Sequence, residues 1–386
     1  MRVKTAHWSL ITIFSILLIS SSVWWASFNF LLADQTNRLL AVTNLTENYL
    51  KKQFIPKVKP PEVYVKGIYL SAPSVANAKS RQAFIDLLKA TDLNAVVFDI
   101  KDATGYVFYS SRIPEVMKYE ARKPIIDDLP GLVAELHQNG IYVIARQVIF
   151  VDPVLTTARP ELGIIRKGGP PAGEASGVWR NYRGEKWADP TVKEVWDYNL
   201  AIAREVISAG VDEINFDYTR FPSDGPMGLA EYHNPPAKRT DTISEFIAYM
   251  DEGLKDEPAY VSVDFFGLVM DNAVTDYDLG IGQHLAIATS TVDYIYPMAY
   301  PSHYAPGHLG FSNPAQYPYQ VVSHGLKLAQ PMMTESSAKL RVWLQDFDMG
   351  AVYDIAKVRE QIRAVEESPI TRGWVLWNAR NVYNYY

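Results

Sequence analysis

From residue 63 onwards the sequence repeats one unit: a short apolar strand, a polar residue at its end, a loop and a helix. The eight predicted strands read VKGIYLSA, LNAVVFDIKDA, IYVIARQVIF, VDEINFDYTRF, AYVSVDFFGLV, VDYIYPMAY, LRVWLQDFD and RGWVLWNA. A helix between two strands returns the chain to the same edge of the sheet, so the strands are expected to pair in parallel. Their nearly continuous apolar character predicts that both faces are covered.

Eight such units in roughly 320 residues predict a closed α/β barrel, the (β/α)8 TIM barrel. An open doubly wound sheet is disfavoured, because no Gly-rich nucleotide fingerprint follows the first strand. The helical segment after the fifth strand, LGIGQHLAIATST, is short and is expected to be irregular.

The N-terminus carries a long apolar run. No Lys, Arg, Asp or Glu occurs between Trp8 and Ala33, and Arg2 and Lys4 precede the run. A run of this length can cross a bilayer as a helix, and the flanking positive charges favour an N-terminus inside with the bulk of the chain outside. The alternative is a cleaved signal peptide. Leu31 stands where cleavage at Ala33 would require a small residue, which favours an uncleaved anchor.

The predicted organisation therefore has three parts. Residues 1–33 form a transmembrane signal anchor, residues 34–62 a tether with prolines near its end, and residues 63–386 the barrel domain. The expected location is the cell membrane, with the barrel outside the cytoplasm, or secretion if the N-terminus is cleaved.

Composition excludes several classes of function. The net charge is −6 and the pI about 5.7, so no strong positive field exists for binding nucleic acid. The absence of cysteine excludes disulfides and thiolate metal sites. No nucleotide-binding P-loop, Gly-x-Ser-x-Gly elbow or zinc-protease motif occurs, and His303 and His308 are interpreted as loop histidines. No metal or cofactor is expected.

Polar residues gather where the predicted strands end. In TIM barrels the reactive groups lie on this rim, so convergence of many polar strand ends predicts a site. These residues are Asp99, Lys101, Asp102, Arg146, Gln147, Asp217, Arg220, Asp264, Tyr296, Tyr300, Gln345, Asp346, Trp377 and Asn378.

Asp217 and Asp264 are the candidate catalytic pair. They end the fourth and fifth strands, and neighbouring parallel strands run about 4.8 Å apart. Two carboxyl groups can then approach the ~5–5.5 Å separation of a retaining glycosidase, or a wider inverting distance if the tips splay. The alternative is structural: an ion pair between Asp217 and Arg220, with Asp264 capping a loop.

A second polar group, Asp99, Lys101 and Asp102, follows the second strand. Alternation places Asp99 and Lys101 on one face, so a contact between them in the barrel interior is expected. This pair could position a substrate hydroxyl or set only local geometry. Arg146, Tyr296, Tyr300 and the polar ends of the last two strands are further candidates for substrate binding. Aromatic residues make up 12% of the chain, and a minority of them are expected to stack against sugars.

The motifs VKGIYLSA, LNAVVFDIKDATG, DEINFDYTRFPSDG, VSVDFFG, YIYPMAYPSHY and GWVLWNARNVY occur in this order. They resemble a bacterial family of glycoside-hydrolase-like barrel domains over most of residues 63–386. The resemblance to retaining barrel glycosidases implies that Asp217 is the nucleophile and that an acid on the fifth strand donates the proton. That position holds Asp264, where many members of the wider group have Glu.

These observations favour a membrane-anchored glycoside hydrolase that acts on a polysaccharide outside the cytoplasm. The alternative is a glycan-binding or envelope scaffold protein that has kept the barrel without the chemistry. A metal-dependent deacetylase would need a His/Asp cluster that the sequence does not provide.

Overall fold

The computed structural model describes residues 58–169 and 177–383. The predicted anchor at 1–33 and most of the predicted tether lie outside these residues. Within the described ranges, no helix combines the length and the apolar character needed to span a bilayer.

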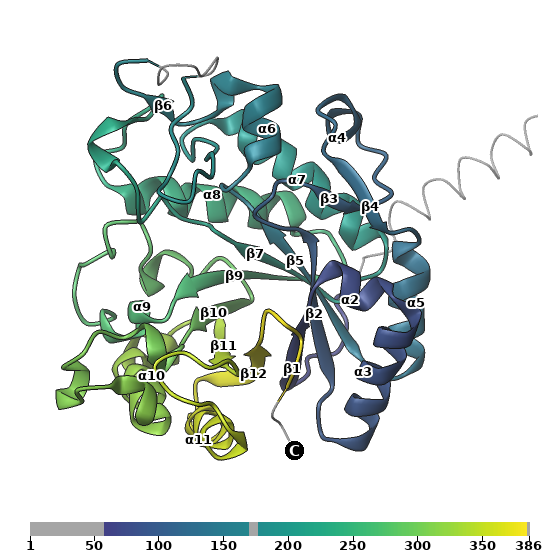
Figure 1. The fold of residues 1–386 in the computed structure, drawn as a ribbon, viewed down its shortest axis with the longest axis vertical. Coiled ribbons are helices and arrows are strands. Elements are labelled where there is room, and N and C mark those ends of the chain that lie inside the picture. Colours follow the sequence, from purple (N-terminus) through teal and green to yellow (C-terminus); the bar gives the residue numbers. More distant parts are fainter. Residues whose placement is uncertain (1–57, 170–176, 384–386) are drawn as a thin grey trace, which may run out of the picture. The chain divides into compact units, whose positions relative to one another are not determined.

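Eight parallel strands close into a barrel (Figure 1), which confirms the predicted α/β barrel architecture. The strand β1 pairs with β2 on one side and with β12 on the other, so the sheet has no free edge at this seam. The barrel strands are β1 (Val65–Leu70), β2 (Ala95–Lys101), β5 (Tyr142–Val148), β7 (Glu213–Asp217), β9 (Tyr260–Phe266), β10 (Tyr294–Met298), β11 (Lys339–Gln345) and β12 (Thr371–Trp377).

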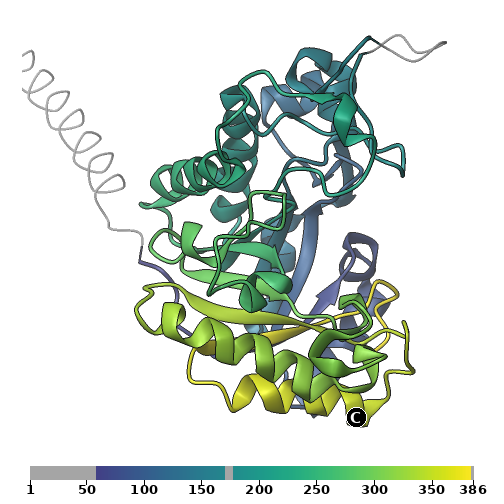
Figure 2. The same cartoon turned by 90° about the vertical axis from the view of Figure 1, so that its left-hand side faces the viewer.

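Helices surround these strands, and in Figure 2 the helices α10 and α11 lie side by side. The helices are α2 (Ala72–Ala76), α3 (Ala78–Ala90), α4 (Pro114–Lys118), α5 (Leu129–Gln138), α6 (Pro153–Ala158), α7 (Lys193–Ser208), α8 (Arg239–Leu254), α9 (Leu268–Asp271), α10 (Pro318–Thr334) and α11 (Ile355–Glu366). After β9 the chain forms only the four-residue α9 and a 3-10 turn at Leu285–Ile287, as expected for this irregular unit.

Polar side chains define where several helices begin. Asn77, Asp128 and Asp354 precede α3, α5 and α11, and each accepts a hydrogen bond from a backbone N–H in the first turn. These N–H groups have no partner within the helix, so the caps stabilise each start by ~1 kcal/mol.

Two short excursions leave the barrel. β3 (Val107–Tyr109) pairs antiparallel with β2, and β4 (Arg122–Ile126) pairs with β3. β6 (Ile165–Arg166) pairs antiparallel with β8 (Ala230–Glu231). This second pair joins the long loop after β5 to the segment after β7.

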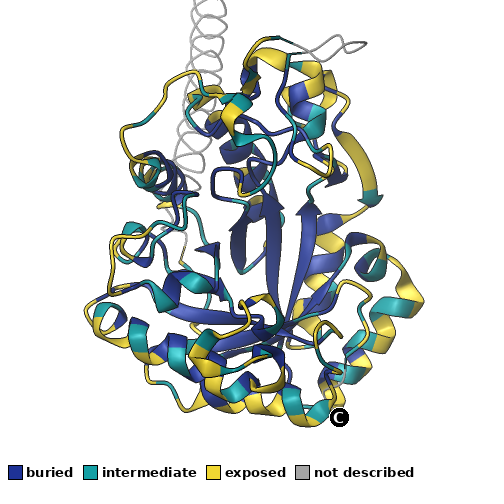
Figure 3. Cartoon of the chain, turned by 60° about the vertical axis from the view of Figure 1, so that its left-hand side comes forward, coloured by how far each residue is buried: buried dark blue, intermediate teal, exposed yellow. Residues whose placement is uncertain are grey.

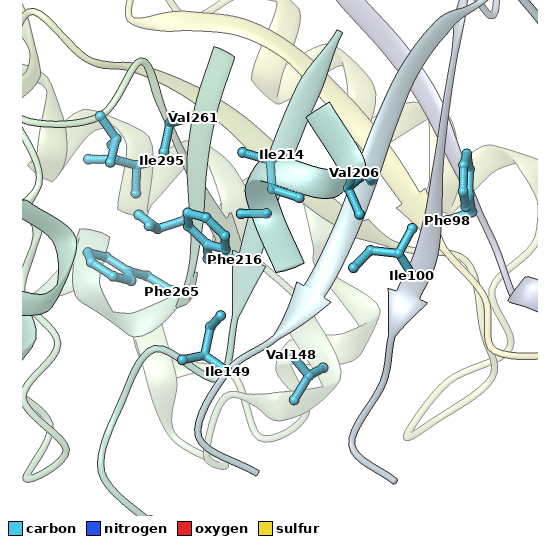
Figure 4. Close-up of a cluster of buried hydrophobic side chains, with 14 of the residues drawn as sticks. Phe98, Ile100, Val148, Ile149, Val206, Ile214, Phe216, Val261, Phe265 and Ile295 are labelled. Atoms are coloured by element: carbon cyan, nitrogen blue, oxygen red, sulfur yellow. The ribbon is translucent and has the colours of Figure 1, made fainter. Parts of the chain in front are cut away.

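Each barrel strand has two buried faces, which Figure 3 shows as dark blue strands inside partly exposed helices. On β7, Ile214 and Phe216 point outward and join a cluster with Val206 of α7 (Figure 4). The alternate residues Glu213, Asn215 and Asp217 make their contacts inside the barrel. Alternate residues of β7 thus face opposite sides of the sheet: the apolar ones pack against the surrounding helices, and the polar ones face the barrel interior.

Glycine is required where the barrel closes. Gly373 of β12 pairs with Val65 of β1 and has φ +134°, a conformation that L side chains rarely adopt. A Cβ at this position would clash with the Val65 backbone. The closing strands can therefore approach only because residue 373 lacks a side chain.

A buried ion pair fills the N-terminal end of the barrel interior. Arg341 on β11 contacts Glu213 on β7, and both side chains are fully buried. The Tyr142 hydroxyl donates to Glu213 at 3.1 Å, and the Arg341 guanidinium lies 3.5 Å from the Tyr294 ring centroid. Since this end has one cation for one carboxylate, its charges are balanced within the fold.

We expect replacement of one partner of this pair to destabilise the barrel more than replacement of both. Arg341→Met leaves Glu213 charged and unpaired in the interior, which should lower the free energy of unfolding by about 3–5 kcal/mol. The double variant Glu213→Gln/Arg341→Met should recover most of this loss, because Gln still accepts from Tyr142. Urea unfolding followed by tryptophan fluorescence measures both, and equal losses would contradict the prediction.

Candidate active site

Arg146 of β5 is the centre of the polar network at the C-terminal end of the barrel. Its Nη1 donates to Asp99 of β2 at 2.5 Å, and its Nη2 donates to Asp217 of β7. Its Nε lies 3.8 Å from Asp264 of β9 and has no hydrogen-bond partner. Four neighbouring strands thus deliver one guanidinium and three carboxyl groups to one place. We call these four residues the rim cluster.

The rim cluster carries more acid than base, and all four residues are buried. Burial raises the pKa of Asp99, although Arg146 and Tyr69 oppose this shift. Burial and then the nearby charge of Asp217 raise the pKa of Asp264 well above its usual range. Burial alone would lower the pKa of Arg146, but Asp99 and Asp217 hold it well above the ordinary value. The guanidinium stays charged, and the cluster favours retention of a proton on a carboxyl group.

Hydrogen bonds orient the carboxyl groups. Asp264 Oδ1 accepts from Asn215 Nδ2 and Trp343 Nε1, both at 2.8 Å. The backbone N–H of Tyr218 donates to Asp217 at 2.5 Å. The Tyr69 hydroxyl donates to Asp99 at 2.5 Å, which fixes the remaining oxygen of that carboxylate.

Tyr218 has an uncommon backbone conformation, with φ +54°. A non-glycine residue in this left-handed region costs about 1–2 kcal/mol. The positive φ sets the direction of the Tyr218 ring and of the chain that follows, and the N–H of the same residue donates to Asp217. Local strain and orientation of a rim carboxylate therefore coincide at one residue.

Aromatic rings border the rim cluster. The Trp377 ring stacks on Tyr69 with centroids 4.0 Å apart, and the Arg146 guanidinium lies 5.2 Å from the Trp377 centroid. Tyr300 is buried, and its pKa is raised by burial and by the charges of Asp264 and Asp217. Trp377 and Tyr300, both predicted from the sequence, are thus close to the acidic groups.

Other predicted site residues make contacts away from the rim cluster. The Tyr296 hydroxyl lies 3.5 Å from Arg341, at the opposite end of the interior. Gln147 points outward and donates to Asn199 of α7 at 3.0 Å. Asp102 accepts from Thr104 in an exposed turn.

Three predicted residues at or just after the ends of β11 and β12 hold loops together. Gln345 accepts from the Ser302 backbone at 3.1 Å and donates to the Phe347 carbonyl at 2.9 Å. Asn378 donates to the carbonyl of Asp346, and both side chains are buried.

The expected contact between Asp99 and Lys101 is replaced by other pairings. The pairing of β2 with β5 shifts register between these residues. Lys101 instead pairs with Asp152 at 2.9 Å, with both side chains fully buried, and donates to the Val148 carbonyl at 2.7 Å. The irregularity breaks the alternation on which the expectation depended.

Arg220 lies beside the rim cluster but forms no ion pair. Among the described residues, no carboxylate lies within 4.0 Å of its guanidinium, so the alternative ion pair with Asp217 is not formed. Its guanidinium carbon lies 4.9 Å from the Tyr218 ring centroid and 4.8 Å from that of Phe266.

Sequence reasoning missed Tyr69, Asn215 and Trp343 as partners of the acids. Each occupies an inward position of a barrel strand, so alternation counted back from Asp217 and along β1 and β11 would have identified them. Within residues 58–169 and 177–383, no group of three or more His, Asp or Glu side chains is arranged to hold a metal ion.

We expect Arg146→Gln to destabilise the barrel in a pH-dependent way. The variant leaves Asp99 and Asp217 without their cation, which should cost about 3–5 kcal/mol at neutral pH. Carboxyl groups with a raised folded-state pKa bind protons more tightly in the folded state, so stability falls as pH rises through that raised pKa. The deficit relative to wild type should therefore shrink toward roughly pH 4.

Urea unfolding at several pH values measures this deficit, and Arg359→Gln on the exposed side of α11 is the matched control. A deficit that does not change with pH would contradict the interpretation.

Comparisons with known proteins agree with this architecture. The structure of the PgaB (BpsB) glycoside hydrolase domain from Bordetella bronchiseptica is 14% identical, with a TM-score of 0.56, and the match covers 83% of this chain and 94% of that chain. A beta-N-acetylhexosaminidase is 13% identical with a TM-score of 0.53, over 83% of this chain and 67% of that one. At these identities the likeness shows the fold alone.

A hypothetical protein from Ruminiclostridium thermocellum ATCC 27405 is 36% identical, with a TM-score of 0.46, over 51% of this chain and 96% of that chain. A search of curated proteins found no match. A family model described as "Putative glycosyl hydrolase domain" (DUF4015) matches residues 67–383. The chain therefore belongs to this family of glycosyl-hydrolase-like barrel domains.

Proposed function

We propose that the barrel is a glycoside hydrolase that cleaves a polysaccharide with two rim carboxyl groups. The observation that carries the proposal is the rim cluster: three acids and one cation at the end of the barrel where such folds hold their reactive groups. Family membership and the similar glycosidase folds support the reaction class.

The proposed roles follow from the environment of each acid. Asp217 is the nucleophile, because Arg146 and the Tyr218 N–H both donate to its carboxylate and stabilise the charged form. Asp264 is the proton donor, because its raised pKa keeps it protonated where an ordinary Asp would ionise.

In the proposed retaining reaction, the Asp217 carboxylate forms a bond to the anomeric carbon while the bond to the leaving oxygen breaks. That oxygen takes the proton of Asp264. Water then attacks the glycosyl ester, gives its proton to the ionised Asp264 and releases Asp217, so both residues return to their first state.

Exposure favours a second assignment of the donor. Asp264 is only 1% exposed, whereas Asp99 is 5% exposed and also has a raised pKa. Asp99 and Asp217 accept from the two terminal nitrogens of one planar guanidinium, which limits the separation of the bonded oxygens to about 7 Å. This limit is compatible with glycosidase spacing of ~5–9.5 Å.

Replacement of each acid separates these roles. We expect Asp217→Asn to lower kcat/KM at least ~1,000-fold, and replacement of the true donor to lower it ~100-fold or more. An activated nitrophenyl leaving group needs little protonation, so it should rescue only the donor variant, either Asp264→Asn or Asp99→Asn. Loss of the donor should also remove the decline of activity with rising pH, since the donor must be protonated to act.

The assay uses the full-length protein on a panel of polysaccharides and nitrophenyl glycosides, with Asp256→Asn in the exposed turn after α8 as control. If the wild type is active and Asp217→Asn matches it, the proposed mechanism is wrong.

The burial of the acids supports one alternative, a glycan-binding barrel in which the rim cluster is structural. This function predicts that the wild type hydrolyses no glycan of the panel. It also predicts glycan binding that survives Asp217→Asn and depends on rim aromatics such as Trp377.

We also propose that residues 1–33 anchor the protein in the cytoplasmic membrane, that residues 34–62 tether it, and that the barrel domain of 63–386 lies outside. The support is the uncharged apolar run preceded by Arg2 and Lys4.

Membrane fractionation with protease treatment of spheroplasts tests the proposed anchor. The full-length chain should sediment with membranes, and external protease should digest the barrel. A soluble, shortened chain would indicate cleavage, and a protease-protected barrel would exclude the proposed orientation.

A further inference from the structure

Arg220 is a buried cation just beyond the rim carboxylate Asp217. Only 7% of its surface is exposed. Three rings surround it: the guanidinium carbon lies 4.8 Å from the Phe266 centroid, 4.9 Å from Tyr218 and 5.0 Å from Trp187. The rings come from β9, the end of β7 and the long loop after β5, so three distant segments build this environment.

The hydrogen bonds of Arg220 use only part of its guanidinium. Nη1 donates to the Phe221 carbonyl at 3.1 Å and to Ser223 Oγ at 3.3 Å. In the described ranges, Nε and Nη2 donate to no residue, and no carboxylate lies within 4.0 Å. Two nitrogens of the fork therefore remain available to a ligand.

Two other buried arginines of the described residues, Arg146 and Arg341, differ in this respect. Arg146 has three acids around it, and Arg341 contacts Glu213. Buried charges in proteins are normally paired, because an unpaired cation loses its hydration without compensation. Burial accordingly lowers the pKa of Arg220. The aromatic rings return part of the lost stabilisation through cation–π contacts but supply no negative charge.

We infer that Arg220 binds an anionic group of the substrate. This group is a carboxylate on the sugar unit next to the one that Asp217 attacks. The planar guanidinium fork matches the two oxygens of a carboxylate, and its free Nε and Nη2 supply two parallel donors. The three rings shield the resulting pair from water, which strengthens it. The substrate class is therefore an acidic polysaccharide, and this inference rests on the proposed function.

The ion pairs of the rim acids favour Arg220 over Arg146 as the position of the anion. Arg146 donates to Asp99 and Asp217, whereas Asp217, Asp224 and Glu185 act on the charge of Arg220 only from beyond 4.0 Å. A carboxylate at Arg220 thus meets a cation without displacing an ion pair of the protein. A ligand carboxylate placed at Arg146 would instead compete with both acids.

Calorimetric titration of the full-length protein tests the inference with acidic tetrasaccharides and their neutral counterparts. The pairs with a neutral member are tetragalacturonate with its methyl ester and a hyaluronan tetrasaccharide with its carboxyl-reduced form. A chondroitin sulfate tetrasaccharide and its desulfated form, which keeps its carboxylates, separate recognition of sulfate from recognition of carboxylate. We expect at least one carboxylate ligand to bind ten-fold or more tightly than its neutral counterpart. Arg220→Gln should abolish this preference and change the affinity for the neutral counterpart by less than about three-fold. The control variant Arg359→Gln should retain the preference.

Several outcomes would overturn the inference: no preference for any acidic ligand, a preference unaffected by Arg220→Gln, or a preference that follows sulfate rather than carboxylate. A purely structural Arg220 would also be revealed by stability. Because it lacks an ion pair, we expect Arg220→Gln to shift the urea midpoint less than Arg146→Gln does, and an equal or larger shift would contradict the inference.

The anion site and the proposed hydrolysis can be disproved separately. If an acidic ligand binds in an Arg220-dependent way but is not hydrolysed, the anion site is supported and the proposed hydrolase activity is rejected. Asp217-dependent cleavage of neutral glycans, with no acidic preference, would do the reverse.

Discussion

The guanidinium of Arg146 makes it possible to bury three acids at the end of the barrel. Without it, Asp99 and Asp217 would be desolvated charges on neighbouring parts of one rim, a state that costs several kcal/mol per ion. One cation, however, does not balance three carboxylates. Burial raises the pKa values of Asp99 and Asp264, and the nearby charge of Asp217 raises that of Asp264 further. Arg146 opposes these shifts, so its ion pairs allow the cluster to form while burial favours a carboxyl group that holds a proton.

The opposite end of the same barrel shows what an exclusively structural charge pair looks like. There Glu213 and Arg341 are matched one to one, and Tyr142 and Tyr294 fill the space around them. Both ends are buried, so burial alone does not distinguish a site from a core. The two ends differ in their charges. At the N-terminal end of the interior the charges of Glu213 and Arg341 balance, whereas the rim cluster has more carboxyl groups than cations. Arg220, next to the rim cluster, has no carboxylate of the described residues within 4.0 Å.

The sequence was sufficient for the barrel because the information is local. Each unit carries its own apolar strand, polar strand end and helical segment, so eight units could be counted without any long-range contact. The partners of the site residues are not local. Asp99 was expected to meet Lys101, two residues away, but a register shift sends Lys101 to Asp152, and Asp99 pairs with Arg146 from the next strand. Pairings of this kind depend on barrel closure and on irregularities that no periodic pattern contains.

Tyr218 links the two charged features of the rim. Its N–H donates to Asp217, its ring lies 4.9 Å from the Arg220 guanidinium, and its left-handed backbone sets the direction of that ring. An ordinary φ at this residue would move the ring and redirect the chain toward Arg220. The left-handed conformation of Tyr218 costs about 1–2 kcal/mol of stability, and we interpret it as a requirement of the local geometry. Because the same residue positions the proposed nucleophile and borders the proposed anion site, a sugar held at Arg220 is placed at a defined distance from Asp217.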